Sequence, residues 1–286
     1  MKIIKTVIEL QSYLKGFREK DNSIGFVPTM GALHRGHLTL VEQAREYCGV
    51  VVVSIFVNPT QFNNPNDLQR YPKDLKKDCD LLEVAGCDVV FAPEVTEVYP
   101  EKDERVFDFG DLENVMEGKY RPGHFNGVAQ VVSRLFELVR PDKAFFGLKD
   151  FQQLAIVREM VSQLNLLVDI VPCETVRESD GLAMSSRNML LTNQQRKNAP
   201  VIAKTLFESC NFASGKTVKE TIDYVVSQVN EVEGLEVEYF EIADGYSLKA
   251  IDKWDESEYI VGCIAVFAGE IRLIDNVIYK NTGHEC

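Results

Sequence analysis

The sequence predicts an α/β protein in which a doubly wound parallel sheet is followed by a smaller α+β domain. Short apolar segments alternate with helix-like segments over roughly the first 170 residues. After this point two helical patterns precede three strand-like segments, which is the order expected of an α+β domain. The 286-residue chain is long enough for a large core, and its 45% hydrophobic and 26% charged residues exclude a disordered or collagen-like protein.

Five segments of the first part are predicted to be buried strands, because they are rich in β-branched or aromatic residues and are bounded by Pro, Gly or Asn. Helices are expected between them where apolar residues recur at helical spacing, and Pro141 ends the most apolar helix. Strand and helix in succession imply right-handed crossovers and hence a parallel, doubly wound sheet. The predicted strands are residues 23–27, 50–57, 88–91, 143–146 and 167–171, and the predicted helices are residues 41–48, 73–85, 126–140 and 151–164.

The second part begins near Thr175, where this alternation stops. We therefore expect a Rossmann-like domain over residues 1–174 and a small α+β domain over residues 175–286. Within the second domain, helices are predicted over residues 193–209 and 218–231, and strands over residues 237–242, 259–267 and 271–274.

Charge and cysteine content limit the classes of partner. Lys and Arg number 31 against 44 Asp and Glu, and the net charge of −13 repels nucleic acid and anionic lipid, although a local basic pocket can bind a phosphate ester. The seven scattered cysteines form no Cys-x-x-Cys pair, so we expect reduced, mostly buried thiols and neither disulfides nor a zinc site. The first residues lack the apolar core of a signal peptide, and no segment reaches the ~20 apolar residues that span a bilayer. We expect a soluble, cytoplasmic protein without a membrane or nucleic-acid partner.

A cluster of histidine and glycine residues follows the first predicted strand. The segment from Pro28 to His37 leads into a helix, at the place where ligands bind in open α/β sheets and unpaired N–H groups favour anions. His34 and His37 are three residues apart, so they lie on one face of the first helical turn, and Gly31 lets the backbone approach a ligand. This arrangement suits stabilisation of charge on a triphosphate during attack at its α-phosphorus. Two surface histidines, or half of a metal site, are the alternatives.

A second segment repeats the order of strand, glycine and helix. Gly147 follows a predicted strand, and Lys149 after it is a point charge suited to phosphate. Asp150 is either an acidic residue at a helix start or a contact for magnesium, and Gln153 lies one turn further along the helix. A solvated surface lysine is the alternative interpretation of Lys149.

Two other segments add polar side chains. Gln61 follows the strand over residues 50–57 and is suited to orient a hydroxy acid, although the Asn-Pro-Thr before it is also a common turn. Ser185, Ser186 and Arg187 combine two hydroxyls with a guanidinium that suit a phosphate, although such a segment is also typical of a helix N-cap. Three of the four segments are strand-to-helix junctions and the fourth lies where two domains meet, so we expect all of them to face one cleft.

Together these segments resemble the pantothenate synthetase family, the pantoate–β-alanine ligases, over essentially the whole chain. The His-x-Gly-His pattern after a strand is typical of the wider nucleotidyl-transferase superfamily, whereas all five matching segments together are specific to this ligase family. The matching segments are residues 28–37, 56–62, 118–128, 145–153 and 184–188.

The resemblance implies an enzyme of pantothenate biosynthesis that condenses D-pantoate with β-alanine in two steps. The pantoate carboxylate first attacks the α-phosphorus of ATP, which gives pantoyl adenylate and pyrophosphate. The amine of β-alanine then displaces AMP and forms pantothenate. The resemblance further implies Mg²⁺, which accompanies ATP and is held mainly by phosphate oxygens, and a homodimer.

The resemblance also assigns roles to individual residues. His34 and His37 contact the triphosphate, and His37 is the proton donor. Charge on the departing pyrophosphate is stabilised by Lys149, Ser185, Ser186 and Arg187, and pantoate is held by Gln61 and Gln153. The nucleotide site is lined by Met30, Gly31, Gly147, Asp150, Val176 and Met184.

Three other functions make different predictions. A related nucleotidyltransferase uses the same histidine pair on another small substrate, and a regulatory module binds ATP without turnover. A tRNA-charging enzyme is disfavoured by the charge of −13 and by the absence of a basic extension.

For the ligase we expect the two domains to hinge near Thr175, so that Arg187 reaches phosphates held by His37. His124 is expected to be a structural histidine at a helix start, and His284 to have no catalytic role.

Overall fold

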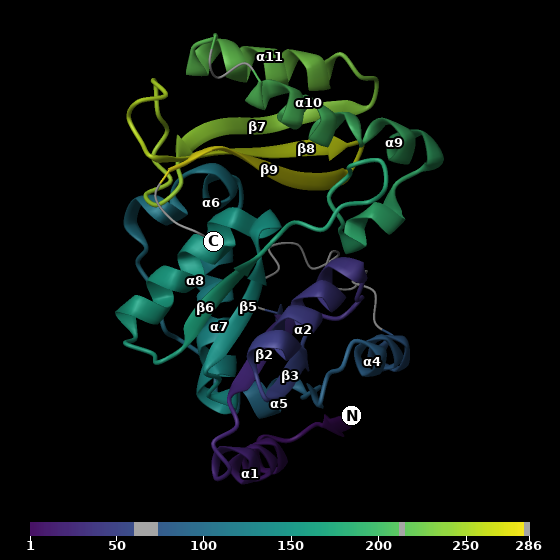
Figure 1. Ribbon diagram of the computed structural model, residues 1–286, viewed down its shortest axis with the longest axis vertical. Coiled ribbons are helices and arrows are strands. Elements are labelled where there is room, and N and C mark those ends of the chain that lie inside the picture. Colours follow the sequence, from purple (N-terminus) through teal and green to yellow (C-terminus); the bar gives the residue numbers. More distant parts are fainter. Residues whose placement is uncertain (60–73, 212–214, 283–286) are drawn as a thin grey trace. The chain divides into compact units, whose positions relative to one another are not determined.

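The computed structural model describes residues 1–59, 74–211 and 215–282 (Figure 1). The chain divides into two compact units. One change of unit falls between Glu174 and Thr175, and two short segments earlier in the chain also belong to the second unit. Unit 1 comprises residues 1–109, 121–148 and 156–174, and unit 2 comprises residues 110–120, 149–155 and 175–286. The predicted division into two domains at residue 174 stays a prediction.

A six-stranded sheet forms the centre of unit 1. Its strands lie in the order β1-β4-β3-β2-β5-β6, and every neighbouring pair is parallel. The predicted parallel α/β class is therefore confirmed. The strands are β1 (Lys2–Ile4), β2 (Ile24–Thr29), β3 (Val50–Ile55), β4 (Val89–Phe91), β5 (Lys143–Gly147) and β6 (Asp169–Cys173).

Helices cover both faces of this sheet, as the contacts of two successive residues of β2 show. Successive residues of a strand point to opposite faces of the sheet. The Phe26 ring packs against Phe136 of α7, with ring centroids 6.1 Å apart. The next residue, Val27, belongs to a separate core with Val41 and Ala44 of α2. Among its described residues, unit 1 has the helices α1 (Val7–Arg18), α2 (Arg35–Tyr47), α4 (Leu75–Val84), α5 (Val95–Val98) and α7 (His124–Val139). Helix α8 (Phe151–Gln163) begins in unit 2 and continues in unit 1.

Unit 2 is built on a three-stranded antiparallel sheet in the order β7-β8-β9. Helices α10 and α11 pack on this sheet through an apolar core that includes Leu206, Val225 and Ile264. Helices followed by strands thus form the small α+β unit that the sequence predicts. Its elements are α6 (Met116–Tyr120), α9 (Asn193–Asn198), α10 (Val201–Cys210), α11 (Val218–Asn230), β7 (Leu235–Asp244), β8 (Tyr259–Ala268) and β9 (Ile271–Asn281).

The sequence prediction is wrong at the two ends of the chain and within residues 193–209, where one predicted helix is instead α9 and α10, separated by Ala199 and Pro200. It assigns no element to residues 2–18, where the structure has β1 and α1. A strand of three residues, such as β1, is too short to show alternation. It ends the last strand at Ile274, whereas β9 continues to Asn281. The polar residues Asp275 and Asn276 interrupt the apolar pattern there, yet both are buried within the strand.

Burial of the cysteines agrees with the sequence prediction. Cys210 is half-buried, and five other described cysteines are buried, namely Cys48, Cys79, Cys87, Cys173 and Cys263. Burial raises the pKa of the Cys87 thiol to about 12, so this thiol stays protonated at neutral pH. Cys286 lies outside the described residues.

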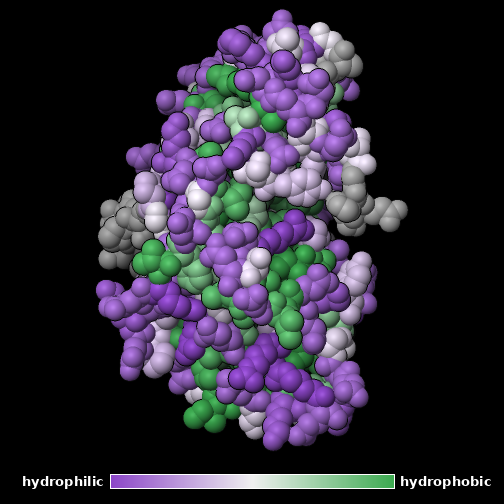
Figure 2. All heavy atoms as spheres, turned by 90° about the vertical axis from the view of Figure 1, so that its left-hand side faces the viewer, coloured by the Kyte–Doolittle hydropathy of each residue, from purple (hydrophilic) through white to green (hydrophobic). Residues whose placement is uncertain are grey.

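Figure 2 shows one face of the molecule, on which hydrophilic residues predominate and hydrophobic residues form separate groups between them. Among the described helices, none combines the length and the apolar character needed to cross a bilayer.

Candidate functional site

The carboxyl ends of β2 and β5 lie side by side where the strand order of the unit 1 sheet reverses. The chain runs outward from β2 to β3 and β4 on one side, and from β5 to β6 on the other. In open α/β sheets, ligands bind at such a point, outside the carboxyl ends of the strands. Met30 and Gly31 follow β2, and Gly147 ends β5, so three predicted nucleotide-site residues lie at this edge of the sheet.

The turn after β2 has a backbone conformation that few side chains adopt. Gly31 and Ala32 both have positive φ, +83° and +51°. This left-handed region costs a residue with a Cβ about 1–2 kcal/mol. Thr29 holds the start of the turn, because its Oγ1 donates to the Ser54 carbonyl at 2.6 Å and accepts from Gly31 N at 3.2 Å. The backbone path into the histidine segment therefore favours glycine at position 31, where a Cβ would also lie 2.9 Å from Asp78 Oδ2.

The two predicted histidines cap the first turn of α2 reciprocally. His34 is the N-cap residue, and its Nδ1 accepts from Gly36 N at 3.2 Å. His37 Nδ1 accepts from His34 N at 3.3 Å, and the two ring centroids are 4.1 Å apart. The spacing of three residues thus brings the rings together, as predicted. The pattern is that of a capping box, with imidazoles in place of the usual hydroxyl and carboxyl groups.

These two hydrogen bonds fix the tautomer of each neutral imidazole. A ring nitrogen that accepts a hydrogen bond carries no proton, so the proton of each neutral ring lies on Nε2. Nε2 is therefore the donor nitrogen of both His34 and His37. Two such N–H donors can stabilise a negatively charged oxygen without either ring carrying a charge.

The backbone amides of this turn are already used within the chain. The buried carboxylate of Asp78 in α4 accepts from Ala32 N at 3.0 Å and from Leu33 N at 2.8 Å. His34 N donates to the His37 ring, and His37 N donates to the His34 carbonyl at 2.9 Å. These four amides therefore have acceptors within the chain and are not the unpaired N–H groups that the sequence analysis expects. Binding of an anion at this helix start stays a prediction.

The segment around Lys149 leads into α8. Residues Leu148–Asp150 form a short 3-10 helix that continues directly into the longer helix. The Lys149 side chain is only 17% exposed, and its Nζ lies 3.6 Å from Asp150 Oδ1. Gln153 is half-buried, one turn after Asp150. Because protein atoms cover most of Lys149, it differs from the solvated surface lysine that was the alternative interpretation.

The segment after Met184 begins with an N-cap, which was the alternative interpretation of these residues. Ser185 Oγ accepts from Arg187 N at 3.2 Å and so caps a 3-10 helix, Ser186–Leu190. This bond leaves the hydroxyl proton of Ser185 able to donate, so capping does not prevent contact with a phosphate. Met184 N donates to the Val176 carbonyl at 2.9 Å, which brings two predicted nucleotide-site residues together in unit 2.

Two consecutive residues of β9 hold both of these unit 2 segments. The buried Asp275 carboxylate forms a bidentate ion pair with Arg177, at N–O distances of 2.6 and 2.8 Å, and Arg177 directly follows Val176. The side-chain amide of Asn276 donates to the Lys149 carbonyl at 3.0 Å. Sequence reasoning missed these anchoring residues, because the ion pair joins positions 98 residues apart and no local pattern marks it.

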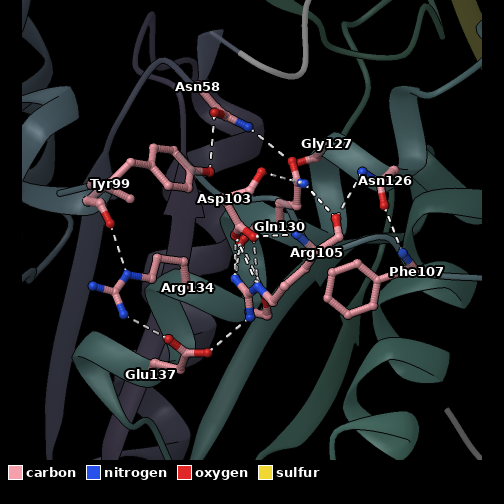
Figure 3. Close-up of polar contacts among 12 residues, drawn as sticks. Asn58, Tyr99, Asp103, Arg105, Phe107, Asn126, Gly127, Gln130, Arg134 and Glu137 are labelled. Atoms are coloured by element: carbon pink, nitrogen blue, oxygen red, sulfur yellow. Dashed lines mark hydrogen bonds and ion pairs between the residues drawn. The ribbon is translucent and has the colours of Figure 1, made fainter. Parts of the chain in front are cut away.

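Asn58, three residues after the end of β3, is held in a polar network of unit 1 (Figure 3). Its Nδ2 donates to the Gly127 carbonyl in α7 at 3.1 Å, and its Oδ1 accepts from the Tyr99 hydroxyl at 3.4 Å. The turn that the sequence suggests after this strand thus has a buried amide at its start. Gln61, the predicted pantoate contact, lies outside the described residues, and its role stays a prediction.

Polar side chains on α7 hold an irregular segment of unit 1, residues 99–107 (Figure 3). Gln130 Nε2 donates to the Asp103 carbonyl at 3.3 Å and to the Arg105 carbonyl at 2.7 Å. Arg105 also pairs with the Asp103 carboxylate at 2.6 Å and with Glu137 at 3.1 Å. Hydrogen bonds from Arg105 hold the pKa of the Asp103 carboxyl below its usual value. Side chains thus satisfy backbone groups that have no partner in a sheet or helix.

His124 is the first residue of α7 and is buried. Its Nε2 lies 3.3 Å from Nη1 of Arg121. This confirms the predicted position at a helix start.

The residues present fit magnesium that arrives with a nucleotide. Among the described residues, no group of three or more His, Cys, Asp or Glu side chains could hold a metal ion. Asp150 offers a carboxylate that is 45% exposed. Mg²⁺ keeps several waters and binds phosphate oxygens, so one protein carboxylate is enough to contact it.

The candidate residues fall into two groups. Met30, Gly31, His34, His37 and Gly147 belong to unit 1, and the structure brings the two histidines into contact there. Unit 2 holds Lys149, Asp150, Gln153, Val176, Met184, Ser185, Ser186 and Arg187. Their participation in one reaction stays a prediction.

Comparison with known proteins gives a consistent answer. The sequence profile of the pantoate-beta-alanine ligase family matches residues 2–278. Pantothenate synthetase from Bacteroides fragilis (strain YCH46) is 53% identical over 282 residues, which cover 99% of this chain and 100% of that relative. The enzyme from Phocaeicola vulgatus is 55% identical over 281 residues, covering 98% of this chain and 100% of the relative.

Solved structures agree with the sequence matches. The crystal structure of pantothenate synthetase from Thermus thermophilus has a TM-score of 0.92 and 45% identity, covering 98% of this chain and 100% of the other. Pantoate-beta-alanine ligase from Francisella tularensis, complexed with beta-gamma ATP and β-alanine, has a TM-score of 0.80 and 34% identity, covering 98% of each chain.

Proposed function

The chain belongs to the pantoate–β-alanine ligase family, and from this premise we propose that it condenses D-pantoate with β-alanine using ATP. The products are pantothenate, AMP and pyrophosphate. The observation that carries the proposal is the family match over residues 2–278. ATP and β-alanine as substrates are further supported by the relative from Francisella tularensis, which was solved with beta-gamma ATP and β-alanine bound.

The reaction proceeds through an acyl adenylate. A carboxylate oxygen of pantoate forms a bond to the α-phosphorus of ATP, and the bond from that phosphorus to pyrophosphate breaks. The amine of β-alanine then attacks the acyl carbon and loses a proton, and AMP leaves with the carboxylate oxygen. Adenylation makes a good leaving group, so no nucleophile from the protein is needed, and positioning and charge stabilisation supply the catalysis.

The histidine pair acts on the phosphates in this proposal. His34 and His37 each carry the proton of their neutral ring on Nε2, because Nδ1 accepts a backbone hydrogen bond. Donation from Nε2 stabilises phosphate oxygens whose negative charge increases as pyrophosphate leaves. His37 donates a proton to the leaving group only as an imidazolium, in which Nδ1 is also protonated and no longer accepts from His34 N.

The other residues bind substrate or stabilise the same charge. Asp150 lines the nucleotide site and would contact Mg²⁺, which would neutralise phosphate charge when it enters with ATP. We also propose that the protein is a homodimer and that it is located in the cytoplasm. Lys149, Ser185, Ser186 and Arg187 stabilise the departing pyrophosphate, Gln61 and Gln153 hold pantoate, and Met30, Gly31, Gly147, Val176 and Met184 line the nucleotide site.

Exchange of labelled pyrophosphate into ATP tests the first step. The assay contains the protein, magnesium, ATP and D-pantoate, and it omits β-alanine. Exchange that requires pantoate supports the adenylate and identifies the acid substrate. AMP that forms only after β-alanine is added, without prior exchange, contradicts a separate adenylate step. If folded protein binds ATP and gives neither result, the ligase proposal is wrong.

A further inference from the structure

We propose that Asp78 is a positioning residue for the catalytic histidines, a role that rests on the proposed function. Its carboxylate is buried, at 3% exposure, although it lies 45 residues from the turn that it contacts. Neither the motifs nor the spacing of the sequence indicated this residue. Its side chain touches the backbone of the histidine turn and none of the reacting groups that we assign.

The contact is made to two successive amides just before His34. Asp78 Oδ2 accepts from Ala32 N at 3.0 Å, and Oδ1 accepts from Leu33 N at 2.8 Å. Both oxygens of one carboxylate are thus aimed at consecutive N–H groups. A carboxylate can accept both bonds, whereas an amide has a single acceptor oxygen and places an NH₂ group against the second N–H.

The turn needs such a contact because its backbone is strained. Ala32 has φ of +51°, a conformation that persists in a residue with a Cβ only where the surroundings impose it. Gly31 comes so close to the carboxylate that a Cβ built on it would lie 2.9 Å from Asp78 Oδ2. The Asp78 carboxylate can therefore approach the left-handed turn this closely because residue 31 has no Cβ.

This turn sets the position of both imidazoles. His34 immediately follows Leu33, and its backbone N donates to His37 Nδ1 while its own ring caps Gly36 N. If Ala32 and Leu33 move, the N-cap residue moves with them, and both Nε2 donors leave their places. Displacement of a catalytic group by about 1 Å can lower the rate about 100-fold.

The test is Asp78→Asn, which keeps the size of the side chain and removes one acceptor. We expect kcat and kcat/KM for ATP to fall together by about 10- to 100-fold, because a donor used mainly in the transition state is misplaced. Asp80→Asn is the matched control, since Asp80 lies on the same helix and is exposed. Adding Ala32→Gly to Asp78→Asn should recover part of kcat, because glycine adopts positive φ without strain.

The imidazole ¹⁵N–¹H NMR spectrum gives a readout that does not depend on activity. The chain has four histidines, so their signals can be assigned with single variants. We expect the Nε2–H tautomer for His34 and His37 in the wild type. Asp78→Asn should shift these two sets of signals and leave those of His124 and His284 in place. Asp80→Asn should leave all four unchanged.

Several results would overturn the proposal. Folded Asp78→Asn with kcat within about twofold of the wild type, or with unchanged His34 and His37 signals, contradicts it. If Asp78→Asn does not fold, hydrogen exchange of the wild type decides, since the Ala32 and Leu33 amides must be protected despite lying in a turn. A wild type without ligase activity refutes the proposed function, whereas the NMR and exchange results still decide the role of Asp78.

Discussion

The histidine turn of unit 1 and the Val176–Asn188 segment of unit 2 carry many of the proposed catalytic groups but are held in different ways. Side chains bind the backbone of the histidine turn, through Asp78 and through the two imidazoles themselves. The unit 2 segment is held instead by the buried ion pair of Arg177 with Asp275. Breaking the buried ion pair leaves a charge without its partner inside unit 2, whereas each hydrogen bond of the histidine turn contributes little to the unfolding free energy.

The largest effect is expected from breaking the ion pair. Arg177→Ala leaves the Asp275 carboxylate, 3% exposed as a side chain, without its partner. An unpaired buried charge costs about 3–5 kcal/mol in unfolding free energy. Urea unfolding measures this loss. A variant that unfolds within ~1 kcal/mol of the wild type would contradict the view that this pair holds the unit 2 segment.

The histidine turn should show the opposite balance, with a large effect on rate and a small one on stability. His37→Ala removes one Nε2 donor, and we expect turnover to fall by about 100-fold or more, which corresponds to at least about 2.7 kcal/mol. Loss of the acceptor for His34 N should cost only about 1 kcal/mol in stability. Steady-state kinetics and urea unfolding measure both quantities.

His284→Ala is the matched control for this variant, and its turnover should equal that of the wild type. A near-normal rate for His37→Ala would remove His37 from the mechanism.

The pH dependence of stability tests a hydrogen-bonded pair in unit 1. Hydrogen bonds from Arg105 lower the pKa of Asp103 in the folded protein. A lowered pKa gives stability that is present above the unfolded value, about 4, and that is lost as the pH falls through the folded value. At neutral pH, Asp103→Asn should therefore cost about 1–2 kcal/mol in unfolding free energy. This difference from the wild type should shrink as the pH falls below about 4.

Urea unfolding at a series of pH values measures the difference between Asp103→Asn and the wild type. A difference that stays constant across this range would contradict the assignment of the lowered pKa to Asp103.

The smallest effect is expected at an exposed ion pair in unit 2. Arg196 Nη1 lies 2.6 Å from Asp180 Oδ2, and the two side chains are 35% and 39% exposed, respectively. Solvent screens such a pair, so Asp180→Ala should cost less than about 1 kcal/mol in unfolding free energy. Comparison with Arg177→Ala in the same unfolding assay separates the contribution of burial from that of the charge pair. Equal losses of unfolding free energy in Asp180→Ala and Arg177→Ala would contradict the view that burial makes the Arg177–Asp275 pair more important for stability than the exposed pair.

Local patterns were enough to predict most of the fold and the histidine pair. The alternation of apolar strands and helices predicted the parallel sheet, and the spacing of His34 and His37 predicted contact between their rings. The reciprocal cap could also have been found, because a polar pair at i and i+3 before a helix is the pattern of a capping box. Each of these features depends on residues that are close in the sequence.

Long-range contacts could not be predicted in this way. Asp78 contacts a turn 45 residues away, and Arg177 pairs with a residue 98 positions further along. Asp78 looks like an ordinary acidic residue in the first turn of a helix, and Asp275 looks like an interruption of a strand. Only the packing of distant elements shows that both carboxylates are buried against a specific partner.

Transfer of ¹⁸O from pantoate tests the central claim most directly. D-Pantoate labelled with ¹⁸O in both carboxylate oxygens is incubated with ATP, β-alanine and magnesium, and the products are examined by mass spectrometry. If the carboxylate attacks the α-phosphorus, AMP contains one ¹⁸O atom and the amide of pantothenate keeps the other. Unlabelled AMP, or label in inorganic phosphate or pyrophosphate, would contradict an acyl adenylate.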